Sequence, residues 1–289
     1  MILAAACLLS YGCSKKSINN KENNLLEVST WAKDNQVLPS CFVFPQREYS
    51  LEEGFVPWGG TVSHHFLTAP LIDDWFCQIS KRRRVDTFFM ICPSHYGLST
   101  FDYSVAFCKW NCGEKGFVET DVDYSSKVAE ELKVGNDSEA FLIEHGASTL
   151  MPYIKKYFPD AKVVVIAVNG EPPVSIEYAK KLSDCLRPYF DKKGKRENFL
   201  IVSTDFSHHG TVEQTEYKDN ISLHFFNDPS VRNFIAAVCD NRVGIYALSS
   251  FIKPEDKARI LYHTDSFSIS GEDENDITSY YFSLFGNAD

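Results

Sequence analysis

Three runs of almost uninterrupted apolar residues constrain the fold of this chain more than any other feature of its sequence. The runs are VDTFFMIC (Val85 to Cys92), AKVVVIAV (Ala161 to Val168) and ENFLIVST (Glu197 to Thr204). A strand with one face in water alternates apolar and polar residues, whereas a continuous apolar run is typical of a parallel strand covered by helices on both faces. We therefore predict an α/β fold: a single domain with a central, mostly parallel sheet flanked by helices.

Segments with the apolar spacing of a helix separate these runs along the chain. We expect helices at Ser125 to Lys133, Ser148 to Tyr157, Val174 to Phe190, Ser230 to Cys239 and Gly244 to Phe251. No internal repeat, low-complexity block or second polar linker divides the sequence after residue 35. The predicted domain therefore covers residues 35–289.

Composition supports a packed core and argues against a nucleic-acid partner. Of the 289 residues, 44% are hydrophobic and 14% aromatic, which is enough apolar mass for a sizeable core. The formal net charge of -10 leaves no broad basic surface to neutralise phosphates. The one basic run, Lys81 to Arg84, is short and is interpreted as a solvated turn.

The first twelve residues, MILAAACLLSYG, resemble the leader of a bacterial lipoprotein. The run is shorter than the roughly 20 residues that a helix needs to cross a bilayer, and the small residue Gly12 precedes Cys13. We interpret residues 1–12 as a signal peptide and residues 13–34 as the lipidated Cys13 followed by a polar tether. This predicts a cell-envelope protein of a bacterium, held outside the cytoplasm on a membrane by its lipid. A buried first strand or a frayed terminus is the alternative, since no Lys or Arg precedes the apolar run and Tyr11 is bulky.

Seven cysteines remain when Cys7 and Cys13 are set aside, and an odd number cannot all pair within the chain. At least one thiol is therefore free or bound to something else. Export would permit a disulfide between Cys108 and Cys112, although a chain of this size does not need one.

Histidines are concentrated in four short polar segments at the ends of the expected elements. Six of the eight histidines occur in the pair at 64–65 and in the words PSHYG (93–97), EHG (144–146) and DFSHH (205–209). Ligands gather at the carboxyl ends of parallel strands, and neutral imidazole is the commonest metal ligand. The carboxylates of Glu144 and Asp205 can orient neighbouring imidazoles. The pattern predicts a metal-type or catalytic pocket at one edge of the sheet.

The order of these words, together with a late Cys239 and the final DITSYYFSLF, resembles the Memo family, also called AmmeMemoRadiSam system protein B. Cys92 to His95 match its glycine-proline-serine-histidine word, Glu144 to Gly146 its glutamate-histidine-serine word, and Thr204 to His208 its serine-aspartate-phenylalanine-cysteine-histidine word. The resemblance covers roughly residues 35–286. It implies a fold similar to that of class III extradiol dioxygenases, non-haem iron enzymes that open catechol rings, without implying their reaction.

The resemblance also implies a set of metal ligands. The family's eukaryotic member binds copper through two histidines and a cysteine and acts in redox and motility signalling. These ligands fall on His64, His95 and Cys239, a set that suits copper or iron and also zinc. The remaining site residues, expected to move protons or support the ligands, are His145, His208, Asp205 and Glu144.

Several positions depart from the family's motifs. Ser63 to Leu67 fit the early proline-histidine-alanine-glycine-tyrosine word poorly, so His65 rather than His64 remains an alternative ligand. Only one of the two can face the site, because neighbours on a strand point to opposite faces. Ser207 stands in place of a cysteine, and Ser148 in place of a glutamate.

Three functions are compatible with these observations. The first is a metal-dependent redox enzyme or oxygenase-like hydrolase related to extradiol dioxygenases, with copper- or iron-dependent chemistry. The second is a protein that binds a metal or another small-molecule ligand without turning it over. The third is a scaffold that keeps the fold for protein contacts. Metal content and turnover would separate the three.

Overall fold

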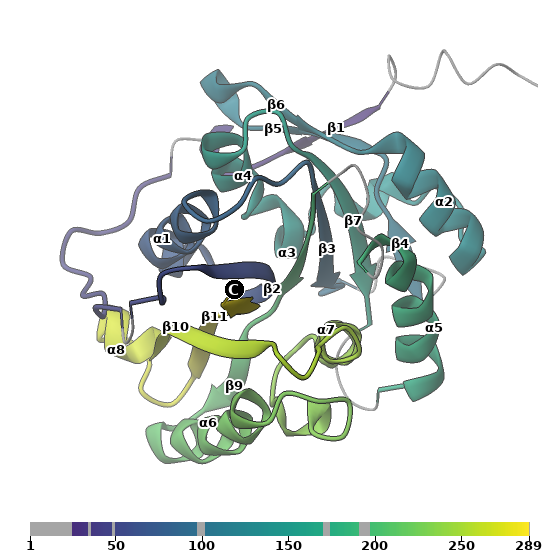
Figure 1. Cartoon of the computed structure of the whole chain (residues 1–289). Coiled ribbons are helices and arrows are strands. Elements are labelled where there is room, and N and C mark those ends of the chain that lie inside the picture. The colour runs from purple at the N-terminus through teal and green to yellow at the C-terminus, as the bar shows by residue number, and fades with distance from the viewer. Residues whose placement is uncertain are drawn as a thin grey trace, which may run out of the picture.

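The computed structural model describes residues 25–33, 36–47, 50–96, 102–169, 174–190 and 197–288. Its larger sheet contains, within those ranges, β2 (Phe55–Val62), β3 (Thr87–Pro93), β4 (Tyr103–Val105), β7 (Lys162–Val168), β8 (Asn198–Ser203), β9 (Phe206–Gly210), β10 (Lys257–Asp265) and β11 (Ile277–Ala288). The order across the sheet is β10-β11-β2-β8-β3-β7-β4, and β9 pairs with β11 outside this path (Figure 1).

The three apolar runs form the centre of this sheet, as predicted. They become β3, β7 and β8, and β3 pairs in parallel with both of the others. β2 continues the parallel region beside β8, whereas β4 and β11 join its two margins in antiparallel orientation. The prediction of one α/β domain is confirmed, and parallel pairing is confined to the four central strands of a mixed sheet.

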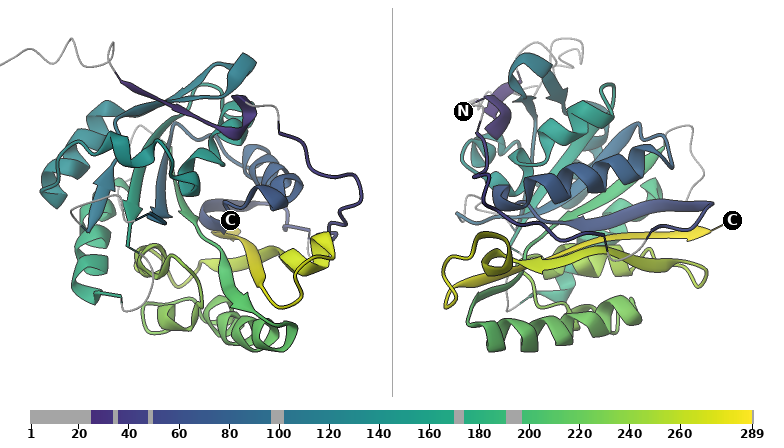
Figure 2. Two further views of the ribbon diagram at one scale, coloured as in Figure 1. Left: turned by 180° about the vertical axis from the view of Figure 1, so that it is seen from behind. Right: turned by 90° about the vertical axis from the view of Figure 1, so that its left-hand side faces the viewer.

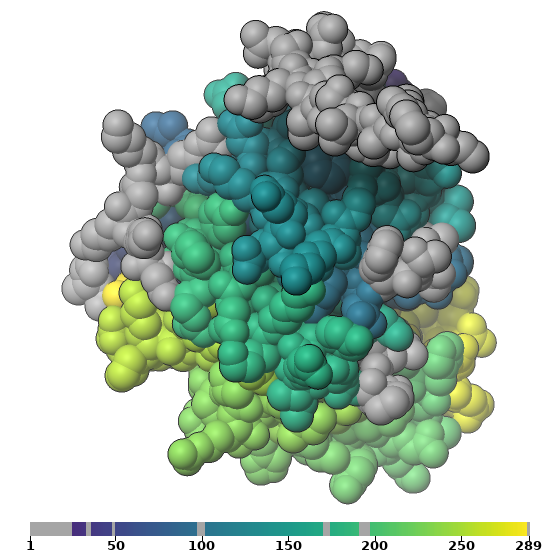
Figure 3. Space-filling model, turned by 90° about the vertical axis from the view of Figure 1, so that its right-hand side faces the viewer, coloured from purple at the N-terminus to yellow at the C-terminus, as the bar shows by residue number. Residues whose placement is uncertain are grey.

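Each central strand supplies two hydrophobic cores, because successive side chains point to opposite faces. On β3, Phe88 and Met90 enter one core, while Phe89 and Ile91 enter the other. Helices α1 (Ala69–Ser80) and α4 (Met151–Tyr157) cover the first face. Helices α2 (Val122–Leu132), α5 (Ile176–Leu186) and α7 (Arg242–Ser249) cover the second. The side of the molecule formed by α2 and α5 faces the viewer in Figure 3.

Three helix predictions are confirmed by α2, α5 and α7. The segment predicted at Ser148 to Tyr157 divides into α3 (His145–Ser148) and α4, with Pro152 in the first turn of α4. The helix predicted at Ser230 to Cys239 is wrong: only a 3-10 turn, η8 (Phe234–Ala236), forms there. The Val238 N–H donates to Ser222 Oγ and Cys239 forms a bridge with Phe206, so these residues are extended rather than helical.

Two long helices were missed from the sequence: α1 and α6 (Val212–Asn227). Helix α6 begins with a capping box, in which the Thr211 side chain accepts from the Gln214 N–H and the Gln214 side chain accepts from the Thr211 N–H. This spacing of Thr and Gln is a known helix-start signal that could have found it. Figure 2 shows α6 running beneath the β10 and β11 pair.

A smaller sheet of β1 (Leu26–Ser29), β5 (Cys108–Asn111) and β6 (Phe117–Glu119) lies beside α4. β1 lies inside the predicted tether of residues 13–34, yet it pairs with β5 and buries Val28. The folded domain therefore begins before residue 35. The predicted leader and Cys13 lie outside the described residues.

All the cysteines within the described ranges carry free thiols, including Cys108 and Cys112. Within the same part of the chain, no helix has both the length and the apolar character needed to span a bilayer.

Candidate metal centre

The histidine segments meet at the carboxyl edge of the parallel strands. His64 follows β2, His95 follows β3, and Asp205 follows β8. Because these strands are adjacent and parallel, their carboxyl ends lie at the same edge. His95 and His208 are far apart in sequence, yet both place Nε2 within 3.8 Å of one carboxylate oxygen, Asp240 Oδ2. The prediction that these two histidines share one edge of the sheet is confirmed.

Three imidazole nitrogens surround Asp240 Oδ2. The distances from this oxygen to Nε2 of His64, His95 and His208 are 3.4, 3.7 and 3.8 Å. Asp205 Oδ2 lies 3.5 Å from the same nitrogen of His64. These separations exceed those of good hydrogen bonds. Two ligand atoms each about 2.1 Å from one metal ion are separated by roughly 3.0–3.4 Å, so a slight contraction would place this cluster around a single ion.

The Asp240 carboxylate accepts hydrogen bonds on one oxygen, while the other has no hydrogen-bond partner among the described residues. Oδ1 accepts from Thr204 Oγ1 at 2.7 Å and from the Asp205 N–H at 3.1 Å. The next residue, Asn241, caps α7 and donates to the carbonyl oxygens of Ile91 and Ser203. Asp240 is therefore fixed between β3, β8 and α7 with Oδ2 directed at the histidines.

Hydrogen bonds also decide which nitrogen of His64 and His95 faces the cluster. The Ser203 hydroxyl donates its only hydrogen to the Gly146 carbonyl, so it can only accept from His64 Nδ1, 3.1 Å away. His95 Nδ1 donates to Glu144 Oε1 at 2.7 Å. Both rings therefore carry a hydrogen on Nδ1 and turn Nε2 toward Asp240, as metal-binding histidines do.

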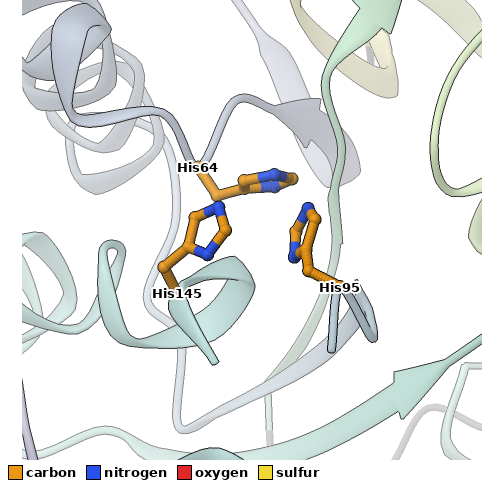
Figure 4. A group of neighbouring side chains, drawn as sticks. All are labelled: His64, His95 and His145. Atoms are coloured by element: carbon orange, nitrogen blue, oxygen red, sulfur yellow. The ribbon is translucent and has the colours of Figure 1, made fainter. Parts of the chain in front are cut away.

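His145 completes the histidine group from the more exposed side. Figure 4 shows its ring beside those of His64 and His95, which come from separate segments. The His145 ring stacks on that of His95 with centroids 4.2 Å apart, and its side chain is 45% exposed, whereas that of His64 is 1% exposed. Nitrogen atoms of these three residues lie within 4.8 Å of one another, a spacing that could hold a metal ion. A second such group consists of His64, Asp205 and Asp240.

Three buried polar atoms of the cluster have no hydrogen-bond partner among the described residues: Asp205 Oδ1, His208 Nε2 and Asp240 Oδ2. A buried polar group without a partner costs about 1–3 kcal/mol. A cation bound among these atoms would remove that cost, because two carboxylate oxygens and an imidazole nitrogen are metal-ligand atoms. The residues present therefore fit a metal ion.

The carboxylates and imidazoles of the cluster shift each other's pKa values in opposite directions. Burial alone would lower the pKa of His95, but the carboxylates of Asp240 and Glu144 outweigh it and raise this pKa to about 10. Burial and the neighbouring His64 and His95 lower the pKa of His145 to about 4. Burial favours a raised pKa for Asp240, yet the charges of the surrounding histidines hold it below its ordinary value. The centre thus combines ionised carboxylates with one imidazole that stays neutral at pH 7.

Cys239 belongs to neither of the two metal-binding groups found in the described part of the chain. Its thiol is buried, and burial followed by the charge of Asp240 raises its pKa to about 12, which opposes formation of the thiolate. The ligand set His64, His95 and Cys239 therefore stays a prediction. The structure does choose between the neighbouring histidines: His64 faces Asp240, whereas His65 Nδ1 bonds to Tyr280 OH at 2.6 Å.

The predicted residues His64, His95, His145, His208, Asp205 and Glu144 all contribute to this cluster. Three residues of the cluster were not predicted from the sequence: Asp240, Ser203 and Asn241. The signal for Asn241 was present, since Asn directly before a helical segment is a common cap. No local pattern marked Asp240 or Ser203, because their roles depend on contacts between distant segments.

Comparison with known proteins points to one family. The family model described as "Memo-like protein" matches residues 66–279. A "MEMO1 family protein" of Pyrobaculum aerophilum is 26% identical over 203 residues, covering 69% of this chain and 68% of that protein. One of Sulfurisphaera tokodaii is also 26% identical, over 77% of this chain and 80% of its own length. An uncharacterized protein from Escherichia coli K12 has a similar structure at 12% identity, with a TM-score of 0.48 over 79% of this chain and 99% of that one.

Proposed function

This chain belongs to the family of Memo-like proteins, and on that premise we propose that it is an iron-dependent redox enzyme acting on a small molecule. The proposed ligands are His64, His95 and Asp240, with His208 and Asp205 beside them. The observation that carries the proposal is the convergence of three Nε2 atoms on the unpartnered Asp240 Oδ2.

The donor set favours Fe(II) over Cu(I). Copper(I) prefers soft thiolate and thioether ligands, whereas two histidines and one carboxylate with open positions are typical of non-haem Fe(II) sites. With Asp240 rather than the Cys239 thiolate as the third ligand, the donor set is harder and suits Fe(II) better than Cu(I). Zinc accepts the same donors, and copper would be favoured if Cys239 became a ligand, so metal analysis distinguishes these outcomes.

A bound ferrous ion would supply redox chemistry and Lewis acidity at this edge of the sheet. The residues of the chain position and support that chemistry. Glu144 and Ser203 hold the His95 and His64 rings in the orientation that presents Nε2. His145 is more exposed than the ligands and neutral at pH 7, so a nitrogen of its ring can accept a hydrogen bond from a molecule that enters the centre and orient it there.

Metal analysis of untagged protein purified without chelators tests the proposal. We expect about one iron per chain in the native protein and a loss of at least 100-fold in Fe(II) affinity in Asp240→Ala, because a ligand is removed. Cys239→Ser should retain native affinity for Fe(II). Equal binding by Asp240→Ala, or loss of iron only in Cys239→Ser, would return the thiol to the ligand set.

Turnover separates an enzyme from a protein that only binds metal. We expect iron-loaded native protein to consume oxygen with at least one substrate of a small-molecule panel, and His145→Gln to keep its iron while losing at least 90% of that rate. Iron binding without turnover of any substrate would favour the non-catalytic alternative.

We also propose that the chain is exported and held on a membrane of the bacterial cell envelope through a lipid on Cys13. The apolar residues 1–12, the small Gly12 before Cys13 and the polar segment after it support this proposal. Labelled fatty acid should enter the native protein and Cys41→Ala but not Cys13→Ala. Labelling of all three would contradict it.

A further inference from the structure

A second polar site lies in a cavity of about 480 Å³ bounded by α6, β10, β11 and α8 (Ser266–Ser270). This volume falls within the range of small-molecule sites. The residues that carry chemistry on its walls are Glu216, Asp219, His263, Asp265, Phe267 and Tyr281. The view in Figure 2 shows the elements concerned, with α6 beneath the strand pair.

Asp219 is the fixed point of this site. It is buried, and its Oδ1 accepts hydrogen bonds from Ser207 Oγ at 2.7 Å and from Ser279 Oγ at 2.6 Å. His263 Nε2 lies 2.7 Å from the second oxygen, Oδ2. The Asp219 carbonyl accepts from Tyr281 OH at 3.0 Å. The hydroxyls of Ser207 on β9 and Ser279 on β11 already tie these strands to Asp219 on α6. The packing of α6 therefore does not depend on the bond from His263, which is partly exposed.

This arrangement orients His263 as buried carboxylates orient catalytic and ligand-binding imidazoles. Because Nε2 donates to Asp219, the neutral ring keeps a lone pair on Nδ1. Tyr281 stacks against the ring with centroids 4.1 Å apart and planes 12° apart, which fixes its plane. Nδ1 has no hydrogen-bond partner among the described residues, and the side chain remains 33% exposed on the cavity wall. A ligand with a hydrogen to donate would find a fixed acceptor here.

The cavity is separate from the metal centre although the two share β9. Ser207 bonds to Asp219 on one side, whereas the adjacent His208 faces Asp240 on the other. Successive residues of a strand point to opposite faces, so β9 stands between the two sites.

The charges on the walls select the class of ligand. Three of the lining residues are carboxylic acids and none is Lys or Arg, while the partly exposed Phe267 and His263 provide aromatic surface. A protonated amine is attracted to both carboxylates and aromatic rings. We propose that this cavity binds a small organic cation whose N–H donates to His263 Nδ1 and whose charge lies near Glu216 and Asp265.

Binding of phenethylammonium to the full protein tests this proposal, with the neutral 2-phenylethanol as the matched probe. We expect the imidazole signals of His263 to shift on titration with the amine, and at least tenfold weaker binding of the alcohol. Glu216→Gln, on the exposed side of α6, should weaken amine binding at least threefold. Glu213→Gln, one turn earlier and outside the cavity lining, should bind like the native protein.

His263→Gln should lose at least 90% of the amine affinity, and a circular dichroism spectrum like that of the native protein would show that its fold is kept. If this variant does not fold, Glu216→Gln and its control still decide the question. Equal binding of the alcohol and the amine, equal binding by Glu216→Gln and Glu213→Gln, or an amine response at His145 rather than His263 would each overturn the proposal.

Discussion

Individual hydrogen bonds decide what each imidazole of the metal centre can do. Ser203 and Glu144 occupy Nδ1 of His64 and His95, so both Nε2 atoms are available to a metal. One polar partner of this kind commonly changes metal affinity by 10–100-fold without touching the metal.

Ser203→Ala should lower metal affinity by roughly 10–100-fold while metal stoichiometry at saturation stays at the native value. The variant removes the acceptor that holds the hydrogen on His64 Nδ1. Competition with a coloured chelator measures the change. Ser249→Ala is the control, since among the described residues that buried hydroxyl bonds only to the Ile245 carbonyl of its own helix. Equal losses in both variants would show a general effect on stability instead.

Metal affinity should rise with pH between pH 6 and 9. The pKa of His95 is raised to about 10 in the metal-free protein, so the ring is protonated at pH 7 and the metal must displace that proton. Each displaced proton gives about a tenfold change in affinity per pH unit below its pKa. Calorimetry in buffers of different ionisation enthalpy would count the protons released. A metal affinity that stops rising above pH 7 would show that His95 has an ordinary imidazole pKa, which would contradict this prediction.

The same slope should persist in Cys239→Ser. A thiol with a pKa of about 12 would also release a proton on binding metal, so a Cys239 ligand would add a second released proton and a steeper slope in the native protein. Loss of one released proton in this variant would identify the thiol as a ligand.

At the scale of elements, the close packing of α1 and β11 against β2 sets the position of His64, which follows β2. Gly60 on β2 lies against Ser283 and α1: a Cβ added there would meet the Ser283 carbonyl oxygen at 2.2 Å and a ring atom of Trp75 at 2.8 Å. Trp75 itself donates to that carbonyl at 2.9 Å. Only glycine lets α1 and β11 pack so closely on the strand that leads to His64.

Gly60→Ala should therefore reduce the free energy of unfolding by about 3 kcal/mol, because the clash involves backbone that cannot move aside. Urea denaturation followed by circular dichroism measures this change. Gly135→Ala is the matched control, since nothing lies within 4 Å of an added Cβ there. A native unfolding midpoint in Gly60→Ala would show that β2 and β11 can separate without cost.

At the scale of the whole molecule, the metal centre joins segments from most of the chain. His64, His95, Asp205 and Asp240 come from loops after three strands and before α7, so one ion would connect both halves of the sheet. Binding only to the folded state stabilises it by mass action.

Free Fe(II) at 100 times its dissociation constant should add about 2.7 kcal/mol to stability. For a domain of this size the unfolding midpoint should rise by roughly 5–10 °C. Anaerobic thermal scans with and without a chelator measure the shift. His64→Ala should show almost none, while Cys185→Ala should respond like the native protein. A metal-independent midpoint in the native chain would place the ion outside the folded core.

The sequence by itself determined the central sheet and the edge at which the site lies. Continuous apolar runs at 85–92, 161–168 and 197–204 can only be strands buried on both faces or buried helices, and their lengths favour strands. The histidine words directly after two of these runs then had to share one edge, because parallel neighbours end together.

Only the tertiary structure decided which side chains face inward. Cys239 and Asp240 are adjacent, and a change of one residue in register exchanges them, so the sequence could not show that Asp240 meets the histidines. The helix predicted before Cys239 depended on local spacing, but contacts with Ser222 and Phe206 made that segment extended. The cavity around His263 likewise depends on Ser207, Asp219 and Ser279, which only folding brings together. Local pattern fixes an element, whereas the direction of a side chain is set by long-range contacts.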